Sequence, residues 1–112
     1  MGNDVRLQAG ALAPGQTVTF SLARAGRSLP AFAVNHAGMV HAYVNACPHA
    51  GNRLDARAAT LLSADGRLLA CSVHGAVFAP DTGVCLEGPC PGARLERLGV
   101  TRDGEHLVIS AP

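Results

Sequence analysis

The chain has 112 residues, of which 48% are hydrophobic and 15% charged, and its formal net charge is +1. A chain of this length forms one domain with a core of ordinary size. So small a charge gives no electrostatic reason to expect nucleic acid or a membrane surface as a partner. No apolar run approaches the roughly 20 residues of a membrane-spanning helix. We therefore expect neither a nucleic-acid partner nor a membrane partner.

Short segments with alternating or β-branched apolar residues recur along the chain, which predicts β-strands. The predicted strands cover residues 16–22, 29–35, 39–45, 67–73, 93–100 and 105–110. Glycine-containing spacers separate most of them and are typical of tight turns: Ala25-Gly26, His36-Ala37-Gly38, Asp65-Gly66, Asp81-Thr82-Gly83 and Asp103-Gly104. Only residues 52–61 have helical character, and we expect a short helical turn there. The sequence predicts an all-β, antiparallel domain.

The N-terminal residues contain no charged segment followed by an apolar one, so no signal peptide is predicted. A cytoplasmic, reducing location is the default expectation for such a chain. In that compartment, cysteines close to histidines are more typical of metal or redox sites than of a disulfide framework.

Two pairs of soft metal ligands stand out in the sequence. Cys47 and His49 are two positions apart, Cys71 and His74 are three apart, and a glycine follows each pair closely. A single cysteine is usually a packing residue, but two such pairs in a short chain favour a shared metal site. Zinc would take all four side chains on one ion, whereas a mixed iron–sulfur cluster takes two thiolates on one iron and two imidazoles on the other. One sulfur and one nitrogen in each loop suit the second arrangement better.

The segments CPHAG (47–51) and CSVHGAVF (71–78) resemble the two cluster-binding boxes of the Rieske family, C-x-H and C-x-x-H. The segment DTGVCLEGPCPGARL (81–95) resembles the sequence that follows them, with a Gly-Pro loop at about residues 86–92 that closes over the cluster. The resemblance implies one [2Fe-2S] cluster, which agrees with the mixed ligand set. It assigns Cys47 and Cys71 to the inner iron and His49 and His74 to the outer iron.

The same resemblance implies a single Rieske domain over residues 1–112. A base of antiparallel strands would come from residues of about 1–44 and 80–112. A small cluster-binding subdomain, about 45–79, would be inserted into this base.

The implied function is that of a free-standing ferredoxin, an electron-transfer protein rather than an enzyme. It would carry one electron from a flavin-dependent reductase to a terminal oxygenase or another redox enzyme. A ring-hydroxylating oxygenase needs a further catalytic domain with a mononuclear iron, for which we expect no room in this chain. Two alternatives stay open: a small Rieske subunit of a larger, nitrite-reductase-like oxidoreductase, and a zinc-stabilised interaction module without a redox role.

The resemblance has informative departures. High-potential Rieske proteins carry an extra cysteine in each box, where this chain has Asn52 and Val73. They also place serine and tyrosine hydroxyls, which donate hydrogen bonds to sulfur, where this chain has Ala76 and Phe78. We therefore expect no disulfide between the boxes, and a midpoint potential low in the Rieske range.

The remaining polar and sulfur-containing residues have simpler interpretations. Cys85 and Cys90 are interpreted as packing residues, with a disulfide or a second metal pair as the alternatives. The histidines outside the boxes are expected to be surface or half-buried residues: His36, His41 and His106. The charged residues near the first box are interpreted as a solvated surface, with a partner-docking patch as the alternative: Arg53, Asp55 and Arg57.

Overall fold

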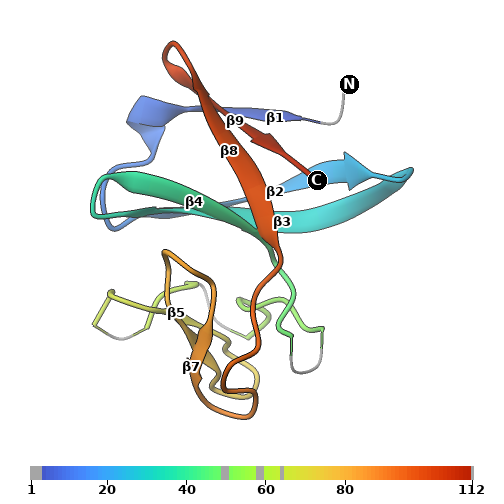
Figure 1. The fold of residues 1–112 in the computed structure, drawn as a ribbon, viewed down its shortest axis with the longest axis vertical. Helices are drawn as coiled ribbons and strands as arrows, with labels where there is room; N and C mark the ends of the chain where they lie inside the picture. The colour runs from blue at the N-terminus through green and yellow to red at the C-terminus, as the bar shows by residue number, and fades with distance from the viewer. Residues whose placement is uncertain (1–3, 49–50, 58–59, 64, 112) are drawn as a thin grey trace. The chain divides into compact units, whose positions relative to one another are not determined.

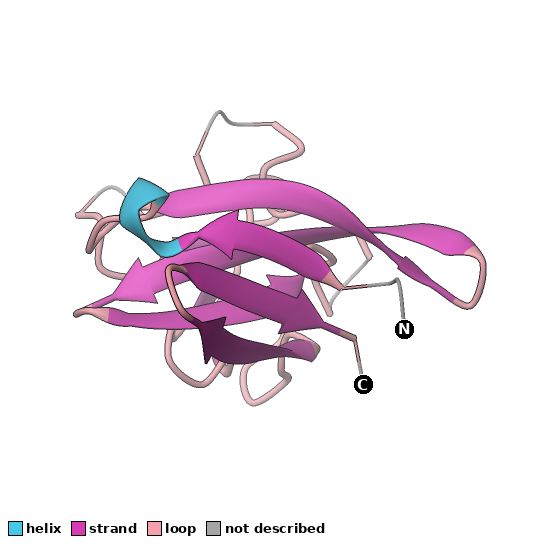
Figure 2. Cartoon of the chain, turned by 90° about the horizontal axis from the view of Figure 1, so that it is seen from above, coloured by secondary structure: helices cyan, strands magenta, loops and turns pink. Residues whose placement is uncertain are grey.

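The structure is a computed structural model of the chain, and it describes residues 4–48, 51–57, 60–63 and 65–111. The chain divides into two compact units, Met1–Val44 with Arg97–Pro112, and Asn45–Glu96. In the described part, the regular secondary structure is β-strand except for a 3₁₀ helix of three residues, η1 (Ala9–Ala11) (Figure 2). This confirms the predicted all-β class. None of the described residues belongs to a helix long and apolar enough to span a bilayer.

The first unit is a six-stranded antiparallel sheet with the strand order β1-β9-β8-β4-β3-β2 (Figure 1). Its strands are β1 (Val5–Gln8), β2 (Thr17–Arg24), β3 (Arg27–His36), β4 (Met39–Val44), β8 (Arg97–Asp103) and β9 (His106–Ser110). Strand β8 pairs with β4, with Ala42 opposite Leu98 and Tyr43 opposite Arg97. The chain therefore leaves this sheet from one strand and returns to the neighbouring one, with the second unit inserted between them in sequence.

Two of the predicted turns join the long hairpins of this sheet. Ala25 and Gly26 have φ angles of 51° and 75°, between the paired residues Arg24 and Arg27. Ala37 and Gly38 have φ angles of 54° and 90° and join β3 to β4 in the same way. Two successive residues with positive φ are the mark of a type I′ turn, whose twist matches that of the flanking strands. These turns fix the register of β2, β3 and β4.

The aromatic residues of the central strands form the middle of the first unit's core. Phe32 on β3 and Tyr43 on β4 lie opposite each other, both fully buried, with ring centroids 5.7 Å apart. The Arg97 guanidinium lies 5.7 Å from the Tyr43 ring centroid, and its Nη2 is 2.7 Å from Nδ1 of His41. His41 is thus a buried residue, which corrects the expectation of a surface or half-buried histidine. His36 and His106 are half-buried, as expected.

The second unit is built around a three-stranded sheet with the order β5-β6-β7. Its strands are β5 (Leu69–Ala70), β6 (Val77–Phe78) and β7 (Cys85–Glu87). We expected the subdomain to end near residue 79, whereas this compact unit continues to Glu96. The difference arises because β7 pairs with β6 and because the Leu95 N–H donates to the Gly83 carbonyl.

Two local predictions in this unit differ from the structure. The strand predicted at residues 67–73 is shortened to Leu69–Ala70, because the chain turns into a loop at Cys71. Within the predicted segment 52–61, residues 54–57 form a turn, with a hydrogen bond from the Ala56 N–H to the Arg53 carbonyl, and the described residues form no helix. Residues 58 and 59 lie outside the described part of the chain.

Candidate metal centre

The first Cys/His box forms a tight loop closed by backbone hydrogen bonds. The Cys47 N–H donates to the Asn52 carbonyl at 2.7 Å, and the Gly51 N–H donates to the Cys47 carbonyl at 2.7 Å. Both backbone groups of the cysteine are therefore occupied by its own loop. His49 lies outside the described residues.

The second box has the same hydrogen-bond pattern at the same spacing. The Cys71 N–H donates to the Ala76 carbonyl at 2.8 Å, and the Gly75 N–H donates to the Cys71 carbonyl at 3.0 Å. In each loop the residue four positions after the cysteine has positive φ, 78° at Gly51 and 76° at Gly75. Glycine adopts this conformation without the steric cost that a β-carbon adds. The glycine that follows each Cys/His pair is thus required by the turn that closes the loop.

The predicted ligands differ in their exposure to solvent. Neither Cys47 nor Cys71 takes part in a disulfide, and each is only 2% exposed, whereas His74 is exposed. Among the described residues, no group of three or more His, Cys, Asp or Glu side chains is placed so that it could hold a metal ion. The geometry thus gives two shielded sulfurs and one imidazole that reaches solvent.

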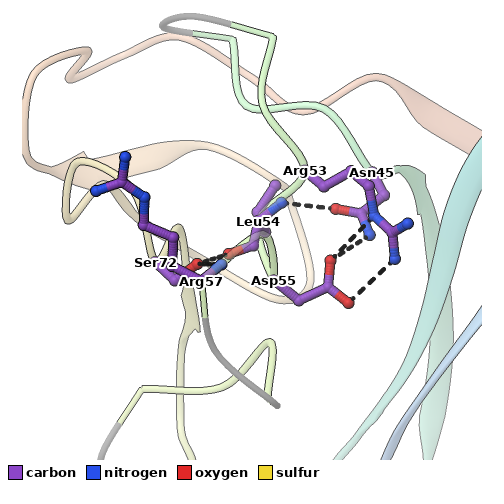
Figure 3. A network of polar contacts seen from close by, with 6 residues as sticks. All are labelled: Asn45, Arg53, Leu54, Asp55, Arg57 and Ser72. Atoms are coloured by element: carbon purple, nitrogen blue, oxygen red, sulfur yellow. Dashed lines mark hydrogen bonds and ion pairs between the residues drawn. The ribbon is translucent and has the colours of Figure 1, made fainter.

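One buried residue, Leu54, ties the two ligand loops together (Figure 3). Its N–H donates to Oδ1 of Asn45 at 2.8 Å, and its carbonyl accepts from the Ser72 N–H at 2.7 Å and from Ser72 Oγ at 2.8 Å. Asn45 stands two residues before Cys47, and Ser72 directly follows Cys71. We call Asn45, Leu54 and Ser72 the Leu54 clamp. Nothing in the local sequence pattern of these residues indicated it.

Asp55 extends this network and is not part of a merely solvated surface, which corrects the sequence interpretation. Its Oδ1 accepts from Asn45 Nδ2 at 3.0 Å, and Arg53 pairs with both carboxylate oxygens at 3.3 and 3.4 Å. Burial acts to raise the pKa of Asp55. The hydrogen bonds from Asn45 and Arg53, with the positive charge of Arg53, outweigh this effect and lower the pKa from its ordinary value of 3.8.

This lowered pKa predicts a specific pH dependence. A carboxyl whose pKa is lower in the folded state stabilises the fold above its unfolded pKa, and the contribution is lost as pH falls through the folded value. We expect wild-type protein to lose stability below about pH 4 more steeply than an Asp55→Asn variant. Urea denaturation at several pH values measures the difference, and equal acid sensitivity of the two proteins would contradict the role of this carboxylate.

The Gly-Pro loop lies against the second ligand loop through the backbone of Gly88. A β-carbon at Gly88 would lie 2.7 Å from the Ala76 Cα and 3.1 Å from the Gly75 carbonyl oxygen. The φ angle of Gly88 is also positive, at 105°. Glycine is therefore needed here both for its conformation and for the close approach of two backbones.

Gly88→Ala tests this contact. We expect a loss of stability of about 2–4 kcal/mol, because the new methyl group meets backbone atoms that cannot rotate away. Gly92→Ala is the matched control, since Gly92 has a φ of 86° but a β-carbon there would meet no atom within 4 Å. The stability of this variant should fall only by the cost of a β-carbon in the left-handed conformation, about 1–2 kcal/mol. Equal losses in thermal or urea denaturation would contradict the close approach.

The two cysteines outside the boxes lie side by side. The Sγ atoms of Cys85 and Cys90 are 3.4 Å apart, and Cys85 Sγ donates to the Glu87 carbonyl at 3.2 Å. Burial raises the pKa of the Cys90 thiol to about 11, and the neighbouring sulfurs of Cys85 and Cys47 contribute to the shift. The Cys90 thiol therefore remains protonated near neutral pH.

The fold and the site together define a class of protein, a small all-β domain in which two Cys/His boxes have the same backbone hydrogen-bond pattern. The chain belongs to the Rieske [2Fe-2S] domain family, which it matches over residues 5–109. A [2Fe-2S] cluster is therefore the cofactor implied by the family. The described donors fit it, because two buried thiols and an exposed imidazole are side chains that a mixed Cys/His cluster needs.

Solved structures show the same fold. The ferredoxin of carbazole 1,9a-dioxygenase from Nocardioides aromaticivorans IC177 is 24% identical, with a TM-score of 0.74 over 98% of this chain and 99% of that one. A chain in a complex of reduced oxygenase and oxidised ferredoxin of carbazole 1,9a-dioxygenase is 20% identical, with a TM-score of 0.76 over 98% and 94% of the two chains. No curated protein sequence gives a significant match.

A longer protein contains a similar domain. The terminal oxygenase of carbazole 1,9a-dioxygenase from Novosphingobium sp. KA1 is 15% identical, with a TM-score of 0.78 over 98% of this chain. The match covers only 30% of that oxygenase chain. At these identities the likeness establishes the fold.

Proposed function

We propose that this protein is a Rieske-type ferredoxin that carries one electron between a reductase and an oxygenase or a related redox enzyme. The observation that carries the proposal is the pair of matched ligand loops, held together by the Leu54 clamp, with buried thiols and an exposed imidazole. A [2Fe-2S] cluster bound there supplies one-electron chemistry. The protein's own residues fix the ligands, shield the sulfurs and leave one edge open to a partner.

We assign the inner iron to Cys47 and Cys71 and the outer iron to His49 and His74. Burial of the two cysteines supports the first assignment, because it protects the thiolates from solvent and from oxidation. The exposure of His74 supports the second, because an imidazole edge at the surface can contact a partner directly. His49 is assigned by its place in the C-x-H box.

The proposed partners follow from the relatives. Two of the similar structures are a ferredoxin of a carbazole dioxygenase and a chain of an oxygenase–ferredoxin complex, each nearly the length of this chain. We propose a terminal oxygenase as the electron acceptor, a flavin-dependent reductase as the donor, and the cytoplasm as the location. The subunit alternative would require a sizeable apolar patch. In the described part of the chain, the exposed large hydrophobic residues are Met39 and Leu86, one in each unit.

The midpoint potential tests the function. The family range runs from about −150 to +300 mV, and hydrogen bonds to the sulfurs set the position within it. Ala76 and Phe78, both fully buried, stand where high-potential relatives carry hydroxyl donors. We expect a midpoint between about −150 and 0 mV in protein-film voltammetry, with one electron taken up per chain in a reductive titration.

The double variant Ala76→Ser with Phe78→Tyr examines the cause of this low value. Restored hydroxyl donors should raise the midpoint on the order of tens of millivolts. Phe32→Tyr, which adds a hydroxyl within the first unit, is the matched control and should not change the midpoint. A wild-type midpoint above about +150 mV, or no rise in the double variant, would contradict the argument.

A further inference from the structure

Cys85 stands at the start of a short loop that backbone hydrogen bonds close, and Cys90 lies within that loop. The Cys85 N–H donates to the Ala93 carbonyl at 2.7 Å, the Gly92 N–H donates to the Cys85 carbonyl at 3.0 Å, and the Ala93 N–H donates to the Cys90 carbonyl at 3.1 Å. These bonds place the two thiols near each other. Their Sγ atoms are 3.4 Å apart, so a bond between them requires an approach of about 1.4 Å.

We propose that Cys85 and Cys90 are a redox modification site, a dithiol that low-molecular-weight disulfides of the glutathione class convert reversibly into a disulfide across the Gly-Pro loop. The proposal goes beyond electron transfer, but the choice of Cys85 and not Cys47 as the partner of Cys90 rests on the proposed function, in which Cys47 is an iron ligand. It rests on the short sulfur–sulfur distance and on the unequal exposure of the two thiols. Cys85 is 2% exposed, whereas Cys90 is half-buried and the more accessible of the two.

The exposure difference sets the order of the chemical steps. Cys90 loses its proton to solvent and attacks one sulfur of the small disulfide, whose S–S bond breaks and releases one small thiol. Cys85, whose S–H points to the Glu87 carbonyl, then loses its proton and attacks the Cys90 sulfur. The second small thiol leaves and the Cys85–Cys90 bond forms. Two protein thiols are oxidised, and one small disulfide is reduced to two thiols.

Cys47 also lies close to Cys90, but as a proposed iron ligand it is not free to form a disulfide. The proposal concerns a reversible conversion, so the position of the equilibrium, and not the rate, is the quantity to measure.

The experiment uses the cluster-loaded protein, equilibrated anaerobically in buffers of increasing ratio of oxidised to reduced glutathione. Each sample is quenched in acid and alkylated in denaturant, and its mass and disulfide-linked peptides are determined. We expect the number of alkylated cysteines to fall from four to two in one reversible transition, with Cys85 linked to Cys90 and the visible spectrum retained. Cys85→Ser should leave Cys90 as an unresolved mixed disulfide with glutathione, and Cys90→Ser should keep three alkylatable cysteines.

Several results would overturn the proposal. Four alkylated cysteines at every ratio would show that the pair does not oxidise. A bond from Cys90 to Cys47, or a stable mixed disulfide in the wild-type protein, would show that Cys85 is not the resolving thiol. Failure of the proposed electron-transfer function would instead appear as a colourless protein, whatever the thiol count.

Discussion

Replacing His74 with cysteine should lower the midpoint potential on the order of 100 mV, or prevent the cluster from being retained. The substituted thiolate keeps a soft ligand but adds a negative charge, which makes uptake of an electron less favourable. An all-cysteine cluster of the plant type lies roughly 250 mV or more below the Rieske range, so one exchanged ligand should produce a substantial part of that shift. Voltammetry and the visible spectrum measure the change directly.

His106→Ala is the matched control for the ligand exchange. His106 is a half-buried histidine on β9, in the first unit, and it belongs to neither ligand loop. Its removal should leave the spectrum and the midpoint unchanged. If the His106 variant lost its colour while the His74 variant kept wild-type properties, the assignment of the outer ligands would be wrong.

Asn45→Ala should give the second large effect, a loss of about 2–4 kcal/mol in stability together with faster loss of iron. Asn45 is 1% exposed, and its side chain satisfies the Leu54 N–H and one oxygen of Asp55. Removing it leaves a buried donor without its partner, which costs about 1–3 kcal/mol, in addition to the lost packing. The Leu54 clamp would then keep its hydrogen bonds to Ser72 but lose the one to Asn45, which connects it to the first ligand loop.

Ser72→Ala is the matched variant on the other half of the clamp. The Ser72 N–H still donates to the Leu54 carbonyl at 2.7 Å when the hydroxyl is removed, so that carbonyl keeps a partner. We expect a smaller loss, about 1 kcal/mol, and slower iron release than in Asn45→Ala. Iron release to a chelator and urea denaturation measure both effects. Iron release from the Asn45 variant at the wild-type rate would contradict a role for the clamp in holding the ligand loops.

The sequence predicts those parts of the fold that depend on local chemistry. The turns at Ala25-Gly26 and Ala37-Gly38 follow from glycine's tolerance of positive φ, and the long strands between them follow from their apolar patterns. The ligand boxes are visible because cysteine and histidine are scarce and their spacing is distinctive. The family match confirms the Rieske resemblance read from these boxes.

Features that depend on contacts distant in sequence were not predictable. Strand β7 has only three residues, Cys85–Glu87, and exists because it pairs with β6. The Leu54 clamp joins residues from three segments through one backbone, so no spacing rule reveals it. Residues 52–61 have helical character by composition, but Leu54 is hydrogen-bonded to Asn45 and Ser72, and residues 54–57 form a turn.

The most direct test of the account is the metal content and spectrum of the purified protein. Cys47, His49, Cys71 and His74 should bind two iron and two acid-labile sulfide ions per chain. The protein should be brown, and reduction should yield a paramagnetic cluster detectable by electron paramagnetic resonance, with one unpaired electron per chain. A colourless protein with one zinc ion bound by the same four side chains would contradict the account and favour the zinc-stabilised interaction module.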